Sequence, residues 1–189
     1  MSRVINGIIE YWLCSGLIPE EDRDVYAYGL ELFVSTVVNV AALMALAIAF
    51  GKVAQTAALL AVMLPLQSCA GGYHAKTHLN CFLIMVLGWF PAMGLMAAFS
   101  GAAALVACAF SLAAVFALAP VRHVNVTMSE RRAKTMKICS RLIAVAAAAL
   151  SAALILSGAR LVRLGVYIAA SMAVLALSML AAYLRNRRK

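Results

Sequence analysis

The sequence predicts an all-α fold, a polytopic membrane helix bundle of about six spans preceded by an amphipathic helix, and three observations lead to it. First, hydrophobic residues make up 66 % of the 189 positions and charged residues only 12 %, whereas a soluble domain is roughly half apolar and about a quarter charged. Second, a soluble fold of this composition would lack the polar side chains needed to cover its surface. Third, a spanning helix needs about 20 apolar residues, so this length holds about six of them with their connections.

The first element is a short amphipathic helix over residues 2–15. Its apolar residues recur at the spacing of one helix face and are Ile5, Ile8, Ile9, Trp12 and Leu13. This helix either lies in the membrane interface or packs on the bundle, and it ends before Gly16 and Pro19. The acidic residues at 20–24 predict a solvated turn directly after it.

Six apolar runs follow, and each predicts a spanning helix. The expected spans are 29–50, 53–68, 79–99, 101–121, 141–157 and 161–184. The second and fifth are short for a hydrocarbon core of about 30 Å, so we expect little tilt or local thinning there, or a second span that enters the membrane only part-way. Pro91 predicts a kink in the third span. The many alanines permit close helix approach and allow a homodimer.

The distribution of Lys and Arg predicts the orientation of the bundle. Six spans place the basic 122–141 segment and both chain termini on one side, and only Lys52, Arg160 and Arg163 of the 16 basic residues fall on the other. Because basic loops stay in the cytoplasm, both termini are expected to be cytoplasmic. The net charge of +9 therefore reflects membrane topology, with the lipid bilayer as partner and no nucleic acid.

We expect the chain to form one integral-membrane domain. Its parts are an interfacial helix and acidic turn over 1–24, a helix bundle over 25–184 and a basic cytoplasmic tail over 185–189. The acidic residues at 20–24 either form a solubilising turn or hold a basic peptide leader. The basic loop 128–137 fits either anionic lipid headgroups or an acidic peptide tail.

One stretch, residues 65–82, departs from the apolar background and holds two of the three histidines and two of the five cysteines. Placing such residues at a membrane boundary costs free energy, so their presence indicates a function. On a continuous helix His74 and Cys81 would lie about 10.5 Å apart along the axis, too far for a catalytic hydrogen bond. Adjacent glycines at 71 and 72 permit a turn that folds His74 back over the next helix. Cys81 would then lie near that helix's N-terminus, which favours a reactive thiolate.

A zinc site is an alternative use of the same residues. His74, His78 and Cys81 can share one helix face, which allows a structural metal site. A zinc peptidase of the common type needs Glu directly after the first His, and this chain has Ala75. Positions 32 to 129 also contain no Asp or Glu. We therefore expect no catalytic metal and no cofactor.

Other residues of the stretch are candidates for substrate binding or for stabilising an oxyanion. They are Gln67, Gly71, Gly72, Tyr73 and Lys76. The oxyanion donor is either the Gln67 amide or the backbone amides of Gly72 and Tyr73. The alternative for Gln67 is a hydrogen bond at the helix end, and for Lys76 a side chain that extends to the membrane surface.

The run Gly71-Gly72-Tyr73-His74-Ala75-Lys76-Thr77, followed by Cys81, resembles the signature of the accessory gene regulator B family. Members are small integral-membrane cysteine endopeptidases of bacterial peptide signalling. The resemblance covers the architecture of essentially the whole chain, and its motifs cover residues 65–82 and 119–137. Relatives often carry arginine at the position of Gln67.

The resemblance implies that Cys81 attacks a short amphipathic signalling propeptide at the cytoplasmic face of the bacterial cell membrane. His74 would accept the thiol proton, and the product would be a thioester acyl-enzyme. In cyclising relatives a Cys or Ser of the peptide attacks this thioester, so cleavage and cyclisation both stay open. A non-catalytic transporter or peptide-handling module is the alternative function. Few polar residues, among them Asn39 and Gln55, lie within spans to support it.

Overall fold

The computed structural model describes residues 2–70, 78–121, 130–158 and 161–187. The helices are α1 (Ser2–Cys14), the 3-10 helix η1 (Glu20–Asp22), α2 (Arg23–Ala49), α3 (Val53–Ala70), α4 (His78–Ala98), α5 (Gly101–Leu118), α6 (Glu130–Leu156) and α7 (Val162–Arg187). The residues so described include no β-strand. Helices α2 to α7 account for the six segments that are long and apolar enough to cross a membrane. The predicted all-α fold and the number of spans are confirmed.

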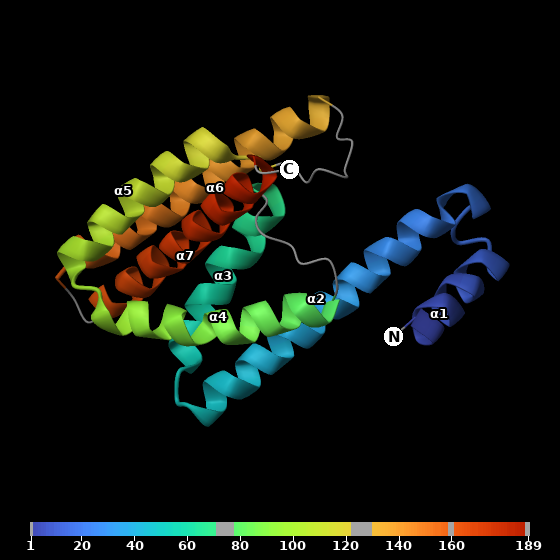
Figure 1. Cartoon of the computed structure of the whole chain (residues 1–189), viewed down its shortest axis with the longest axis horizontal. Helices are drawn as coiled ribbons and strands as arrows, with labels where there is room; N and C mark the ends of the chain where they lie inside the picture. Colours follow the sequence, from blue (N-terminus) through green and yellow to red (C-terminus); the bar gives the residue numbers. More distant parts are fainter. Residues whose placement is uncertain (1, 71–77, 122–129, 159–160, 188–189) are drawn as a thin grey trace.

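Helix α7 forms the centre of the bundle. In its most apolar stretch 61 % of the residues are buried, against at most 39 % in any other spanning helix of the described chain. Helices α3, α5 and α6 surround α7 and share one core cluster with it. Figure 1 shows α5, α6 and α7 running side by side with α3 beside them. Small residues let these helices approach closely, and van der Waals packing must hold them in lipid.

A second core cluster joins α4 to α2, α3 and α7. Its centre is the buried side chain of Trp89, whose indole N–H donates to Thr56 Oγ1 at 2.9 Å. The rings of Phe50 and Phe90 lie 5.6 Å and 5.2 Å from the Trp89 ring, centroid to centroid. A buried indole needs such a hydrogen-bond acceptor, so this contact fixes where α4 crosses the beginning of α3.

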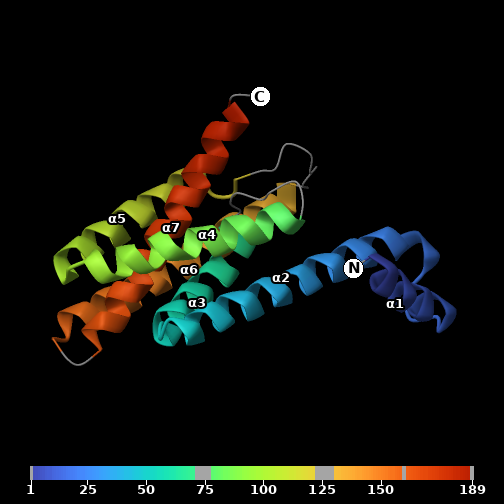
Figure 2. The same cartoon turned by 60° about the horizontal axis from the view of Figure 1, so that its bottom comes forward.

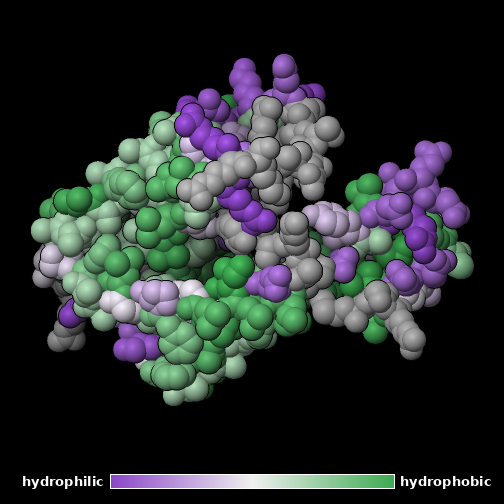
Figure 3. Space-filling model, viewed as in Figure 1, coloured by the Kyte–Doolittle hydropathy of each residue, from purple (hydrophilic) through white to green (hydrophobic). Residues whose placement is uncertain are grey.

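The exterior of the bundle is apolar. Leu156 and Val106 are 74 % and 71 % exposed, as expected for side chains that face lipid tails rather than water. Figure 3 shows hydrophobic surface along the sides of the bundle, with hydrophilic residues gathered at one end and around α1. The chain is therefore a multi-pass membrane protein.

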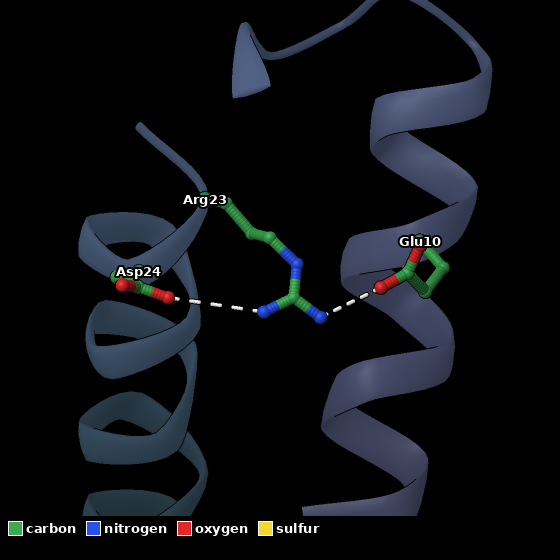
Figure 4. A network of polar contacts seen from close by, with 3 residues as sticks. All are labelled: Glu10, Arg23 and Asp24. Atoms are coloured by element: carbon green, nitrogen blue, oxygen red, sulfur yellow. Dashed lines mark hydrogen bonds and ion pairs between the residues drawn. The ribbon is translucent and has the colours of Figure 1, made fainter. Parts of the chain in front are cut away.

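Helix α1 packs its apolar face against the beginning of α2, and Figure 2 shows the two side by side, away from the other helices. The buried residues of this contact are Ile5, Ile9 and Ile18. Gly16 has a φ of 67°, which lets the chain reverse direction after α1. Arg23 pairs with Glu10 at 2.7 Å and with Asp24 at 3.8 Å (Figure 4). The predicted amphipathic helix is confirmed.

Two regions differ from the prediction. The expected acidic turn at 20–24 is instead η1 and the first residues of α2. The expected basic loop 128–137 is helical from Glu130 onward, so the fifth span is not short: α6 has 27 residues. Hydropathy marks the part of a helix inside the hydrocarbon, whereas backbone hydrogen bonding continues through Arg and Lys, which favour helices. Helix α4 extends on both sides of Pro91.

Candidate active site at the end of helix α3

The predicted site residues divide between described and undescribed parts of the chain. Gln67 lies half-buried in the last turn of α3, and Cys81 lies half-buried in the first turn of α4. The remaining predicted residues lie outside the described residues: they are Gly71, Gly72, Tyr73, His74 and Lys76. The third histidine, His123, also lies outside them.

Cys81 is the fourth residue of α4 as its bounds are described. The sequence predicted this position from the apolar run that starts at residue 79.

The end of α3 is held by a hydrogen bond from the chain that follows α5. The backbone N–H of Val121 donates to the carbonyl oxygen of Ala70 at 2.9 Å. Ala70 itself is completely buried, and Ala119 is 6 % exposed. The Ala119–Pro120 pair begins the second motif region, residues 119–137. It thus lies beside Ala70, the residue directly before Gly71. This hydrogen bond fixes the last residue of α3, directly before Gly71 in the sequence.

Arg141 of α6 contacts the C-terminal end of α5. Its Nη2 donates to the carbonyl oxygen of Phe116 at 3.0 Å, and its guanidinium carbon lies 4.7 Å from the centroid of the Phe116 ring. The last carbonyls of a helix lack partners within that helix, so a cation is a favourable donor there. The buried Arg141 Nε has no hydrogen-bond partner in the described part of the chain.

Helix α6 also packs directly against α3. In the sequence Arg141 belongs only to a basic segment, and its contact has no local signal because its partner lies on another helix. The sequence marks Arg141 only by its position directly before the apolar stretch that starts at Leu142.

The described residues include no group of three or more His, Cys, Asp or Glu side chains that could hold a metal ion. The alternative zinc set of His74, His78 and Cys81 includes a residue outside that part of the chain. What the structure brings together near the end of α3 is therefore a pair of anchoring contacts: Ala70 with Val121, and Arg141 with Phe116.

Replacing Arg141 by methionine is expected to lower the free energy of unfolding by about 1–2 kcal/mol, because the Phe116 carbonyl loses a charged donor. The long apolar chain of methionine keeps most of the packing. The measurement is denaturant unfolding of the purified protein in detergent. Arg163→Met, at an exposed position of α7, is the matched control, and equal stability of the two variants would contradict the prediction.

Comparison with known proteins gives one match over nearly the whole chain. The family model named accessory gene regulator B matches residues 2–183, a range that runs from the start of α1 almost to the end of α7. Searches of curated proteins and of solved structures return no significant match. The matched range includes the 65–82 stretch, the Ala119–Pro120 junction, five of the six candidate spans and most of the sixth. On this evidence the chain belongs to the accessory gene regulator B family.

Proposed function

We propose that this chain is a membrane cysteine endopeptidase that cleaves a short amphipathic signalling propeptide, as in bacterial quorum sensing. The observation that carries the proposal is the family match over residues 2–183 in a chain with Cys81 in the first turn of α4. Seven residues, 71–77, link this helix to the anchored end of α3. Such a linker is long enough to fold His74 back toward Cys81, as a catalytic pair requires.

In the proposed reaction the Cys81 thiolate attacks the carbonyl carbon of the scissile peptide bond. His74 accepts the thiol proton and then donates it to the leaving amine. The oxygen of the tetrahedral intermediate is stabilised either by the Gln67 amide or by backbone amides at Gly72 and Tyr73. The amine product leaves, and the signal segment remains bound to Cys81 as a thioester.

The group that attacks the thioester then determines the product. Attack by water gives a linear peptide, whereas attack by a Cys or Ser within the peptide gives a thiolactone or lactone ring. Exchange of one thioester for another is close to neutral in free energy, so cyclisation needs no second energy source. It does need water to be kept from the acyl-enzyme.

We further propose that the site faces the cytoplasm, at the bacterial cell membrane. Arg131, Lys134 and Lys137 are exposed in the first turns of α6, a helix that packs against α3. Basic residues mark the cytoplasmic side. The same cations can attract either anionic lipid headgroups or an acidic segment of the propeptide, and Lys76 can bind a peptide carboxylate.

The test is to express the chain together with the short peptide encoded beside it and to follow the peptide by mass spectrometry. We expect a shortened peptide only when the chain is present, with the ring form lighter than the linear form by one water. Mild acid quenching should preserve a peptide adduct on the protein that hydroxylamine releases. A peptide that stays full-length beside a folded, membrane-inserted chain would contradict the proposal and favour a transporter or peptide-handling module.

A further inference from the structure

Two polar side chains of α2 are buried without a hydrogen bond. Ser35 and Asn39 are only 8 % and 6 % exposed, and within the described part of the chain neither side chain has a hydrogen-bond partner. The other buried polar residues of those ranges each form a hydrogen bond: they are Thr56, Ser111, Ser140, Ser151 and Ser171. A buried polar group without a partner costs free energy, so these two exceptions indicate a ligand that is bound there.

A ligand can reach the polar atoms of these two residues. Among the described residues, Arg141 Nε is the one fully enclosed side-chain nitrogen or oxygen that lacks a hydrogen-bond partner. The unpaired atoms of Ser35 and Asn39 therefore share in the small surface that stays exposed on each residue. Hydrogen bonds can form at this surface without separation of the helices.

Asn39 lies near the level of the first turn of α4. The buried residues of α2 form one stripe at every fourth position: Ser35, Asn39, Leu43 and Ala47. Directly after α2, the Phe50 ring lies 5.6 Å from the Trp89 ring, centroid to centroid. At 1.5 Å per residue, Asn39 is about 16.5 Å before Phe50 along its helix, and Cys81 is about 12 Å before Trp89. Figure 1 and Figure 2 agree with this register, since both show the beginning of α4 beside the middle of α2.

The two side chains match a neutral ligand that both donates and accepts hydrogen bonds. Helix α2 has no Lys or Arg after Arg23 and one acidic residue, Glu31, beyond its first turn, so charge does not select the ligand. The Asn39 carboxamide has the donor and acceptor of a peptide group and can pair with one peptide N–H and one carbonyl. Ser35 lies about 6 Å earlier along the helix. Alternate peptide groups of an extended chain repeat about every 6.7 Å, so the two side chains can bind one extended segment.

We propose that Ser35 and Asn39 form a binding subsite for the backbone of an extended segment of the propeptide. The identity of this peptide rests on the proposed function. Bound there, the peptide lies along α2 beside the first turn of α4, where Cys81 is the proposed nucleophile. The subsite also provides partners for peptide groups that would otherwise be unsatisfied between apolar helices.

The test measures binding separately from cleavage. The Cys81→Ala chain in lipid nanodiscs is titrated with a fluorescently labelled form of the short peptide encoded beside the chain, and anisotropy gives the Kd. Asn39→Leu and Ser35→Ala are then added to this chain. Thr36→Val is the matched control, because the Thr36 hydroxyl already donates to the Leu32 carbonyl oxygen at 2.8 Å.

We expect Asn39→Leu to raise the Kd about tenfold or more and Ser35→Ala about threefold, as the loss of two and of one hydrogen bond does. Thr36→Val should leave the Kd unchanged. The midpoint of unfolding of Asn39→Leu in SDS should stay at or above that of the parent chain, because leucine leaves no unpaired polar group. Methylation of one peptide N–H of the ligand should weaken binding to the parent chain but not to Asn39→Leu.

Any of three results would overturn the subsite: no binding of the peptide, an unchanged Kd in Asn39→Leu, or a lower unfolding midpoint in that variant, which would assign Asn39 a structural hydrogen bond. The subsite and the cleavage reaction fail separately. A chain with Cys81 intact that binds the peptide through Asn39 but leaves it full-length contradicts cleavage alone. Cleavage by Asn39→Leu with an unchanged KM contradicts the subsite alone.

Discussion

Replacing Cys81 by alanine is expected to abolish propeptide cleavage, lowering the rate by about 10⁴-fold or more, as loss of a catalytic nucleophile does in other peptidases. The reason is chemical: without the sulfur no thioester can form, and the described first turn of α4 offers no other nucleophile in that position. The side chains of cysteine and alanine are similar in size, and Cys81 is only half-buried, so the fold should persist. The measurement is the amount of shortened peptide per folded chain by mass spectrometry.

Replacing His74 by alanine should lower the same rate by about 10²–10⁴-fold, the usual contribution of a general acid–base group. The residual activity should rise with pH, because more thiolate then forms without the help of a base. The Cys81→Ala variant should show no such rise of activity with pH. This difference in pH dependence distinguishes the loss of a base from a loss of folding.

Each variant has a matched control within the chain. Cys14→Ala changes an exposed cysteine of α1, and His123→Ala changes a histidine of the other long connection. Both should process the peptide at the wild-type rate. If Cys81→Ala and His74→Ala also remain active, the assigned pair is wrong, although the family membership would stand. An inactive Cys81→Ala with an active His74→Ala would indicate another base.

Composition predicted the architecture because the bilayer imposes it. With 66 % hydrophobic residues and no water in the hydrocarbon core, apolar runs of about 20 residues satisfy their backbone hydrogen bonds as helices. The same reasoning could not find helix ends, since the first turns of α6 are polar and lie beyond the apolar run. Hydropathy also does not predict which helices pack against each other, so the central position of α7 is seen only in the structure.

The candidate site was predicted in part, for a related reason. Cys81 stands in the first turn of α4, as a glycine pair before an apolar run suggests. The pairing of His74 with Cys81 stays a prediction, because His74 lies outside the described residues. The contacts that anchor this region, Val121 with Ala70 and Arg141 with Phe116, join residues about 25 to 50 positions apart. No local spacing encodes such contacts, and they follow from how the helices pack.

Replacing Gly165 by alanine is expected to destabilise the bundle by about 2–4 kcal/mol, the largest effect on stability that we predict for a single methyl group. A Cβ at this position of α7 would lie 2.8 Å from the backbone oxygen of Ser151 and 2.9 Å from Ile155 Cγ1. A backbone oxygen cannot rotate away, so the two helices would have to separate. That movement would also strain the hydrogen bond from Ser151 Oγ to the Gly165 carbonyl, now 2.7 Å long.

The size of this effect follows from where the contact lies. Ser151 is completely buried, and its hydroxyl also accepts a hydrogen bond from Cys108 of α5, so one methyl group disturbs three helices together. Gly94→Ala on α4 is the matched control, since a Cβ there meets nothing within 4 Å, and its unfolding in SDS should resemble that of the wild type. Gly101→Ala, with Ile155 Cγ2 at 3.2 Å, should fall between the two, because a flexible side chain can move aside. Equal stability of Gly165→Ala and Gly94→Ala would show that α6 and α7 are not packed this closely in the membrane.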